Sequence, residues 1–398
     1  MGESIDKEES RLWTGNFILH TGSYLIMAMS FYFLIPTLPK YVINVLGEDK
    51  SQVGLIIGFY AFSALAIRPI SGFLFDKYGR RYLYLVSLFL FSLTMASYNL
   101  AFTFVILLGI RLIHGAVWGF LTTGGATIAA DLIPEKKRGM GIGIFGLSFT
   151  LSMALGPGIG EWILKEFNFN VLFWSAFFVA LLSLIIAVNV KSPNISDRKQ
   201  RVKVNNLFDR KVAPVAIVMI FLAFPFAGIM SFISLFADEI GLENGGAYFF
   251  IFYAIGVSVL RPLAGFIMDK KGPKLVVAAC MIFSFSGMLM IGFSESAFLF
   301  YTAAIVTGLG NGLIMPVMQT MVINMVPPER RGVANSTLFS AIDLGFGIAS
   351  FMLGMVAQFY SLKVMYILDA IILIIPTFYF FSYVLKYYHN NLYIRRSE

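Results

Sequence analysis

The 398-residue sequence has few charged residues, one cysteine and three histidines, and these shortages exclude several classes of protein. Charged residues make up 13% of the chain, about half of the roughly 25% that is usual in soluble globular proteins. Cys280 is the single cysteine, which excludes an internal disulfide, a zinc ribbon and a cysteine-held iron–sulfur cluster. The histidines lie far apart, at His20, His114 and His389, so no metal site is expected.

The sequence also lacks a nucleotide-binding loop and a secretory signal. No segment has the G-x-x-x-x-G-K-S/T spacing that cradles nucleotide phosphates, so we expect no cofactor and no nucleotide hydrolysis. Residues 1–11 carry four acidic side chains in place of the basic region of a signal peptide. The first apolar run is therefore expected to stay in the protein, and any energy to come from an ion gradient or from another subunit.

Hydrophobic residues, by contrast, make up 58% of the sequence and gather in twelve long apolar runs. Each run has about 18 to 26 residues, enough for a helix to cross the ~30 Å hydrocarbon core of a bilayer. The connections and tails that remain are too short for a separate soluble domain. We predict an all-α integral membrane protein with twelve transmembrane helices in a lipid bilayer.

The basic residues are distributed unevenly between the two sides of the predicted membrane. Of the 30 Lys and Arg residues, 23 lie on the side of the amino-terminal tail and 4 on the opposite side. Because cytoplasmic connections are enriched in Lys and Arg, this distribution places both termini in the cytoplasm and the protein in the inner (cytoplasmic) membrane. It also accounts for the net charge of +8 without nucleic-acid binding.

A basic segment at 191–211 separates six apolar runs from six others, and the two halves repeat each other. A shift of 193 residues places Arg68 on Arg261 and Asp76 on Asp269. An even number of crossings between the copies gives them the same orientation, so we expect two pseudo-symmetric six-helix bundles related by an axis along the membrane normal. The predicted parts are an amino-terminal tail at 1–14, a first bundle at 15–190, the linker at 191–211, a second bundle at 212–387 and a carboxy-terminal tail at 388–398.

The turn between the second and third runs combines an acid with three bases and two glycines. Charges at helix ends can pair and hold one conformation closed, so we predict a gate formed by Asp76, Lys77, Arg80 and Arg81 and, in the repeat, by Asp269. Accumulation of bases on the cytoplasmic side is the alternative explanation, although it does not explain the repeated acid.

This turn resembles the signature loop of the major facilitator superfamily, and the similarity extends over nearly the whole chain. The resemblance implies the major facilitator fold, with twelve helices in two bundles, and transport by alternating access. It implies no enzymatic activity.

The fourth apolar run contains an arginine, which costs ~2.5 to 3.5 kcal/mol at the centre of a bilayer and should therefore face a cavity or a partner. Arg111 shares a helix face with His114 and Trp118. In the superfamily this helix has an Arg followed by Gln-Gly and is associated with proton transfer; His114 occupies the Gln position and adds a titratable group. We predict that Arg111 and His114 take part in proton coupling. A purely structural arginine is the alternative.

In the fifth run, Gly156, Pro157 and Gly160 resemble the antiporter motif of the superfamily, which is associated with export against a cation. Ser152 and Glu161 depart from that motif. We predict a helix-packing hinge at the three matching residues. General enrichment of small residues at membrane helix interfaces is the alternative.

The repeat breaks at Asp343, which maps to Thr150 and lies near the middle of its apolar run. An acid at this position is a candidate for the principal proton carrier, with pairing to a neighbouring helix as the alternative. His20 could join a relay, although a backbone hydrogen bond explains it as well. We assign no role to four acids near outer helix ends, where solvation is cheap: Asp238, Glu239, Glu295 and Asp369. Candidate residues for a substrate cavity are Trp118, Asn311, Tyr32, Tyr253, Met315 and Gln319.

Together these features predict a secondary transporter similar to the twelve-helix drug:proton antiporters. The expected partners are a small organic substrate, amphipathic or hydrophobic, together with protons, and the chain is expected to act as a monomer. Uptake or facilitated transport of a small metabolite on the same fold is one alternative, and a membrane sensor or scaffold without transport is another.

Overall fold

A computed structural model describes residues 12–48, 50–193, 207–242 and 245–393. In these ranges the chain is helical and contains no β-strand, as predicted. Most of the predicted linker and the outer parts of both predicted tails lie outside the described residues. The chain divides into two compact units, which are described separately: the first is 1–134, 148–208 and 328–336, and the second is 135–147, 209–327 and 337–398.

The first unit contains the helices of the first sequence repeat. They are α2 (Gly15–Tyr32), α3 (Leu34–Asn44), α4 (Lys50–Tyr78), α5 (Arg80–Ser97), the 3-10 turn η1 (Tyr98–Leu100), α6 (Phe104–Leu132), most of α7 (Arg138–Glu166) and α8 (Phe169–Val188). The 3-10 turn η4 (Pro328–Arg330) and the first six residues of α13 (Arg331–Phe359) also belong to it.

The second unit contains the helices of the second repeat. They are α9 (Ala213–Glu239), α10 (Gly245–Lys271), α11 (Pro273–Gly292), α12 (Ala297–Asn324), α13 from Thr337 onward, α14 (Leu362–Ile372), α15 (Ile374–Tyr379), a π-helical turn η5 (Phe380–Val384) and α16 (Leu385–Asn390). The 3-10 turn η2 (Glu135–Lys137) and the first ten residues of α7 complete it.

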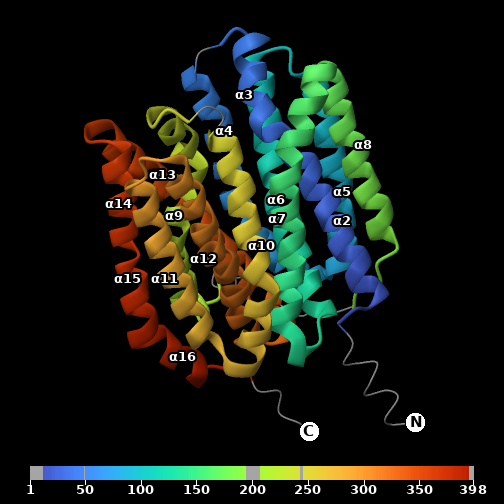
Figure 1. Ribbon diagram of the computed structural model, residues 1–398. Helices are drawn as coiled ribbons and strands as arrows, with labels where there is room; N and C mark the ends of the chain where they lie inside the picture. Colours follow the sequence, from blue (N-terminus) through green and yellow to red (C-terminus); the bar gives the residue numbers. More distant parts are fainter. Residues whose placement is uncertain (1–11, 49, 194–206, 243–244, 394–398) are drawn as a thin grey trace. The chain divides into compact units, whose positions relative to one another are not determined.

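The two units have the same internal packing. In the first, α4 lies against α6, α5 against α6 and α8, and α2 against α8. In the second, α10 lies against α12, α11 against α12 and α14, and α9 against α14, and Figure 1 shows α10, α11 and α12 side by side. Each pair in one unit matches a pair 193 residues away in the sequence, so the repeat is structural as well.

Glycines set the closest helix contacts at equivalent positions of the two units. A Cβ on Gly115 of α6 would collide with the backbone of Tyr60 on α4, and a Cβ on Gly308 of α12 would collide with the backbone of Tyr253 on α10. These helices can approach closely because neither glycine has a side chain.

Local sequence explains where several helices begin and end. Thr14, Asn168 and Ser361 accept a hydrogen bond from the backbone N–H three residues later and so cap α2, α8 and α14. Gly79 and Gly272 occupy equivalent turns with φ of 90° and 75°, a region that favours glycine. The repeated turn motif therefore has a conformational cause.

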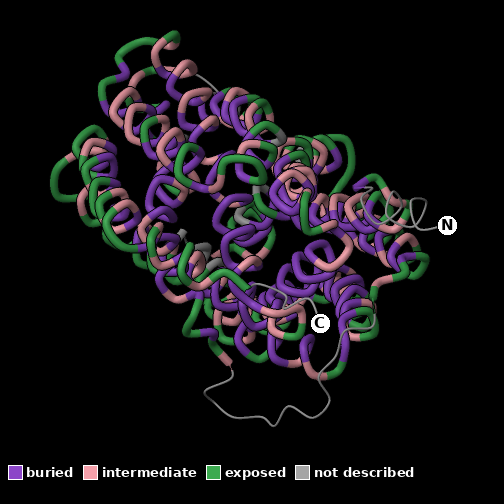
Figure 2. Tube along the Cα trace, turned by 90° about the horizontal axis from the view of Figure 1, so that it is seen from below, coloured by how far each residue is buried: buried purple, intermediate pink, exposed green. Residues whose placement is uncertain are grey.

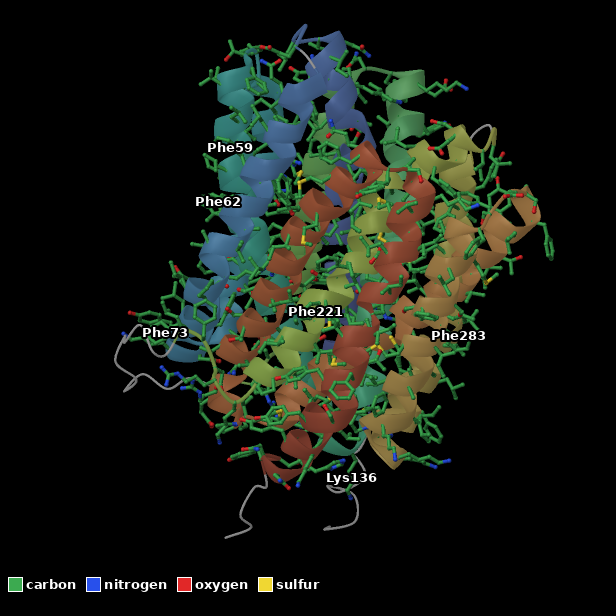
Figure 3. The ribbon with its side chains drawn as sticks, turned by 90° about the vertical axis from the view of Figure 1, so that its left-hand side faces the viewer. Phe59, Phe62, Phe73, Lys136, Phe221 and Phe283 are labelled. Atoms are coloured by element: carbon green, nitrogen blue, oxygen red, sulfur yellow. The ribbon has the colours of Figure 1, made fainter. Side chains whose placement is uncertain are left out.

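Eleven helices among the described residues are long and apolar enough to cross a membrane. The one predicted crossing without such a helix in the described part of the chain is the first in the sequence, which corresponds to α2 and α3. Polar residues such as Asn16 and His20 lower the hydropathy of the 18-residue α2. Buried and exposed residues alternate along the helices (Figure 2). Phe59 and Phe62 point outward from α4 (Figure 3), and the Phe62 side chain is 69% exposed, as expected for a lipid-facing residue.

Candidate functional site

Asp76, at the end of α4, binds the amino terminus of α13. Its Oδ1 accepts a hydrogen bond from the N–H of Gly332 at 2.9 Å, and its Oδ2 accepts one from the N–H of Val333 at 2.8 Å. The first N–H groups of a helix have no partner within the helix, and the helix dipole favours a negative charge there. The Asp76 carboxylate, 1% exposed, satisfies both needs.

Two glycines make room for this contact. A Cβ on Gly332 would lie 2.6 Å from the carbonyl oxygen of Gly72 and 2.7 Å from Oδ1 of Asp76. Any larger residue at position 332 would therefore push α13 away from α4. Gly332 and Asp76 therefore belong to the same contact between α4 and α13.

The same aspartate belongs to a buried network of charges in the first unit. Arg80 Nη2 lies 3.1 Å from Oδ1 of Asp76, and Arg80 Nε lies 2.8 Å from Oδ2 of Asp131 on α6. Arg331, at the start of α13, lies 2.8 Å from Oδ1 of Asp131. Two acids and two bases thus alternate between α4, α5, α6 and α13, with side chains at most 10% exposed.

The other two bases of the predicted gate contact different groups. Arg81 is exposed and donates a hydrogen bond of 2.8 Å to the carbonyl of Val188, at the end of α8, where a cation is favoured by the helix dipole. The Lys77 ammonium lies 5.0 Å from the ring centre of Tyr78. The Asp76 carboxylate therefore joins with Arg80 and the α13 backbone.

The second unit contains the equivalent aspartate contact. Asp269, at the end of α10, accepts hydrogen bonds from the N–H groups of Gly139 at 2.7 Å and Met140 at 3.0 Å, at the start of α7. The charges around it differ, because Arg138 donates to the neutral side chain of Asn324, the residue that the repeat aligns with Asp131. The geometry is repeated and the charge network is not.

Arg111 and His114 on α6 meet at the hydroxyl of Tyr98 inside the first unit. Arg111 Nη1 donates to the Tyr98 oxygen at 3.3 Å, and that oxygen lies 2.7 Å from His114 Nδ1. Since the guanidinium can only donate, the Tyr98 O–H is available to His114 Nδ1. Arg111 also donates to the carbonyl of Ile56 at 3.2 Å and lies over the ring of Tyr60. The buried Arg111 guanidinium therefore contacts two hydrogen-bond acceptors and one aromatic ring.

Aromatic rings form a wall beside this group. Trp118 stacks on Phe31 with 4.1 Å between ring centres, and Phe149 of α7 lies 6.4 Å from Trp118 and 5.6 Å from Tyr32. Trp118 is 6% exposed and Tyr32 9%. The predicted cavity residues of this unit thus belong to one aromatic cluster of α2, α6 and α7.

The predicted hinge residues of α7 lie against the junction of α2 and α3. A Cβ on Gly156 would collide with Tyr32, and a Cβ on Gly160 with the backbone of Phe33. Pro157 lies within the helix, where it removes one backbone N–H. Ser152, at the position where the motif has glycine, donates a hydrogen bond of 2.7 Å to the carbonyl of Leu25 on α2. The side chain of Glu161 lies outside the described part of the structure.

The predicted cavity residues of the second unit lie on α10 and α12. Asn311 donates a hydrogen bond of 3.1 Å to the hydroxyl of Tyr253. Met315 is half-buried, and Gln319 is buried two turns beyond Asn311. Pro316 interrupts the backbone hydrogen bonds of α12 between them.

Asp343 and Asp369 differ in burial, and Asp369 is the more deeply buried of the two acids. Asp343 on α13 is half-buried, whereas Asp369 on α14 is 0% exposed. The expectation that Asp369 is solvated near a helix end was therefore wrong, because its side chain points into the packing of the second unit. His20 lies 2.8 Å from the carbonyl of Gly125 through Nε2, as the backbone explanation requires.

Sequence reasoning missed three residues of these clusters. Asp131 could have been found, because the repeat replaces Asp131 and Arg80 with Asn324 and Pro273 together. Tyr98 has no such signal, since it reaches His114 only through the 3-10 turn that ends α5. The position of Asp369 was inferred from its distance to the helix end, and that distance does not show which side of α14 the residue faces.

Comparison with known proteins gives a consistent family. The sequence matches the Major Facilitator Superfamily over residues 21–257 and 215–395. It is 23% identical to an uncharacterised MFS-type transporter of Methanocaldococcus jannaschii, covering 86% of this chain and 91% of the relative. It is 21% identical to the staphylopine export protein of Staphylococcus aureus, covering 83% and 86%. It is 25% identical to multidrug resistance protein 2 of Bacillus subtilis, covering 81% and 85%.

Solved structures agree on the fold. The crystal structure of the human organic anion transporter MFSD10 has a TM-score of 0.78 at 17% identity, covering 91% of this chain and 98% of that chain. The Escherichia coli fucose:proton symporter FucP has a TM-score of 0.77 at 16% identity, covering 93% and 98%. At such identities the likeness concerns the fold alone. With the sequence match over nearly the whole chain, it shows that this multi-pass membrane protein is a transporter that belongs to the major facilitator superfamily.

Proposed function

We propose that the protein is a secondary active transporter that exports a small organic compound, amphipathic or hydrophobic, in exchange for protons. One relative is an export protein by name and another is named for multidrug resistance, and the α7 motif with Gly156 and Pro157 resembles that of antiporters. The proposed location is the inner (cytoplasmic) membrane with both termini in the cytoplasm, on the distribution of Lys and Arg.

The observation that carries this proposal is the buried contact of Arg111, Tyr98 and His114. A permanent cation and a titratable imidazole share one hydroxyl, so a change of protonation at His114 changes the hydrogen bonds of Arg111. A scaffold protein has no need for an arginine in mid-membrane, whereas a transporter can use its contacts to distinguish two states.

The adjoining aromatic cluster is the proposed substrate wall. Trp118 and Tyr32 offer flat apolar surfaces with polar tips, which suit an amphipathic organic molecule. In the second unit, Tyr253, Asn311, Met315 and Gln319 are the proposed contacts, with hydroxyl and amide groups that fix orientation and a flexible thioether that adapts to shape.

Conformational change requires that the aspartate contacts at α7 and α13 break. Each contains charge-assisted hydrogen bonds to backbone N–H groups, worth about 1.5 to 3 kcal/mol apiece. That energy is small enough for substrate or proton binding to supply, so Asp76 and Asp269 are the proposed gating residues, with Lys77, Arg80 and Arg81 placed around the first. Asp343, half-buried on α13, is the proposed principal proton-coupling acid.

The test is transport in proteoliposomes that contain the purified full chain and an imposed pH gradient. Ethidium and fluorescein serve as a cationic and an anionic aromatic probe. Proton-driven accumulation of either dye against its gradient, abolished by a protonophore, is the expected result. Movement of dye in the same direction as protons would favour the uptake alternative, and a chain that moves neither dye nor protons would contradict the proposal for this substrate class.

A further inference from the structure

The carboxyl group of Asp369 is completely buried, and the proposed export mechanism gives it no task. Its side chain is 0% exposed, and neither carboxyl oxygen has a hydrogen-bond partner among the described residues. Asp369 is the eighth residue of α14, about 10 Å along the helix from its start. That depth places it within the apolar part of the helix.

A glycine on the neighbouring helix makes the space that the carboxyl group fills. A Cβ on Gly228 of α9 would lie 2.7 Å from Oδ2 of Asp369, 3.4 Å from Leu353 and 3.7 Å from the ring of Tyr366. The Tyr366 hydroxyl donates to the carbonyl of Gly228 at 3.2 Å. The nearest hydroxyl on the same helix is therefore already engaged with the backbone and not with the acid.

The helices around Asp369 supply no compensating cation. Those packed against α14 are α9, α11 and α15, and α13 contributes Leu353. Their ionisable groups, with those of α14 itself, are Asp238, Glu239, Lys274, Cys280, Arg331, Asp343, Lys363, Tyr366 and Tyr379. Arg331 lies 2.8 Å from Asp131. Lys363 lies 3.8 Å from Glu295, and no cation of the described chain forms an ion pair with Asp369.

An isolated carboxylate in such surroundings is far more costly than a neutral carboxylic acid, so the group takes up a proton. We propose that Asp369 is a proton-binding site of the second unit, neutral in the conformation described here and deprotonated when α9 and α14 separate. In that step the carboxyl O–H bond breaks, the proton passes to water, and a carboxylate remains. Its use in transport rests on the proposed function, whereas its protonation does not.

A proline lies within α9, and another follows the end of α14. Pro225 lies within α9, three residues before Gly228, and α14 ends at Ile372 shortly before Pro376 of α15. A proline removes a backbone hydrogen bond and allows a helix to bend. Bending at these points would open the seam between Gly228 and Asp369 to water.

The test is infrared spectroscopy of the purified full chain in detergent, titrated with pH in the absence of substrate. The C=O band of one protonated carboxyl per chain should be present at neutral pH, be lost in Asp369→Asn and shift in Asp369→Glu. Asp343→Asn is the matched control and should retain the band. An Asp369→Asn spectrum that keeps every protonated-carboxyl band of the wild type would overturn the proposal.

A second measurement separates proton release from a structural role. The amide of Asp369→Asn resembles the neutral acid, so the melting temperature should stay close to that of the wild type. In proteoliposomes the pH dependence of ethidium exchange should flatten in this variant. A lost infrared band with an unchanged pH profile would overturn the release step. Failure of ethidium transport in the wild type would count against the proposed function and leave the infrared result standing.

Discussion

Arg80 Nε lies 2.8 Å from Oδ2 of Asp131, and neither side chain is exposed. The repeat places Pro273 and Asn324 at these two positions, which cannot form an ion pair. The first unit therefore surrounds its aspartate contact with buried charges, whereas the second unit uses neutral groups at the same places.

Replacement of Asp131 with Asn should destabilise the protein. Arg80 and Arg331 would remain buried with one acid fewer, and removal of one partner from a buried ion pair costs about 3 to 5 kcal/mol. We expect a lower free energy of unfolding in chemical denaturation in detergent. The matched control is Glu135→Gln, because Glu135 is 68% exposed and lies 3.7 Å from Arg138, so that its loss should cost less than about 1 kcal/mol. Equal losses in the free energy of unfolding for Asp131→Asn and Glu135→Gln would contradict the assignment of Asp131 to a buried ion pair.

Asp76→Asn should leave the protein folded and reduce transport. The amide keeps the size of the side chain but loses the charge-assisted bonds to Gly332 and Val333, each worth about 1.5 to 3 kcal/mol. In a Cys280→Ser background, a Val333→Cys probe should react faster with a hydrophilic maleimide when Asp76 is replaced. Asp269→Asn should have a smaller effect on transport. Unchanged labelling and wild-type transport would remove Asp76 from the gate.

Arg111→Ala should abolish proton-coupled movement while the protein still inserts, and Arg111→Lys should restore it only in part. A lysine ammonium is a point charge and cannot reach the Ile56 carbonyl and the Tyr98 hydroxyl as the planar guanidinium does. Tyr98→Phe removes only the shared hydroxyl and should change the pH dependence of dye transport in proteoliposomes. A wild-type profile in Tyr98→Phe would show that the link between Arg111 and His114 is not used.

Trp118→Ala, which removes the ring stacked on Phe31, should alter the range of transported dyes more than the maximal rate.

Asp343→Asn should still bind substrate and exchange it across the membrane but should not accumulate it against a gradient. The variant cannot release a proton, so a pH gradient no longer favours one conformation over the other. Counterflow of labelled dye without a gradient measures exchange, and uptake with a gradient measures accumulation. Should the variant concentrate dye as well as the wild type, the coupling role would pass to another group.

The fold could be predicted from the sequence because it depends on features that are local or repeated. Apolar runs are read residue by residue, and the offset of 193 residues aligns Gly115 with Gly308 and Asp76 with Asp269. These alignments correspond to the same helix pairs in each unit.

The partners within the site were less predictable because they depend on distant backbone and on helix rotation. Asp76 binds N–H groups 256 and 257 residues away, and a backbone N–H has no signature in a sequence. The burial of Asp369 follows from the rotation of α14 against Gly228, and not from its distance to the helix end.

The two aspartate turns have nearly equal geometry and unequal surroundings, and we expect this difference to set the order in which the two contacts break. Gly139 and Met140 are held by Asp269 with hydrogen bonds of 2.7 and 3.0 Å, close to the 2.9 and 2.8 Å at Asp76. The barrier to separation should still be higher at Asp76, where Arg80 adds a buried charge. We therefore expect the α7 terminus to detach earlier than the α13 terminus, so that a molecule built from two copies of one pattern moves through its cycle in a fixed sequence.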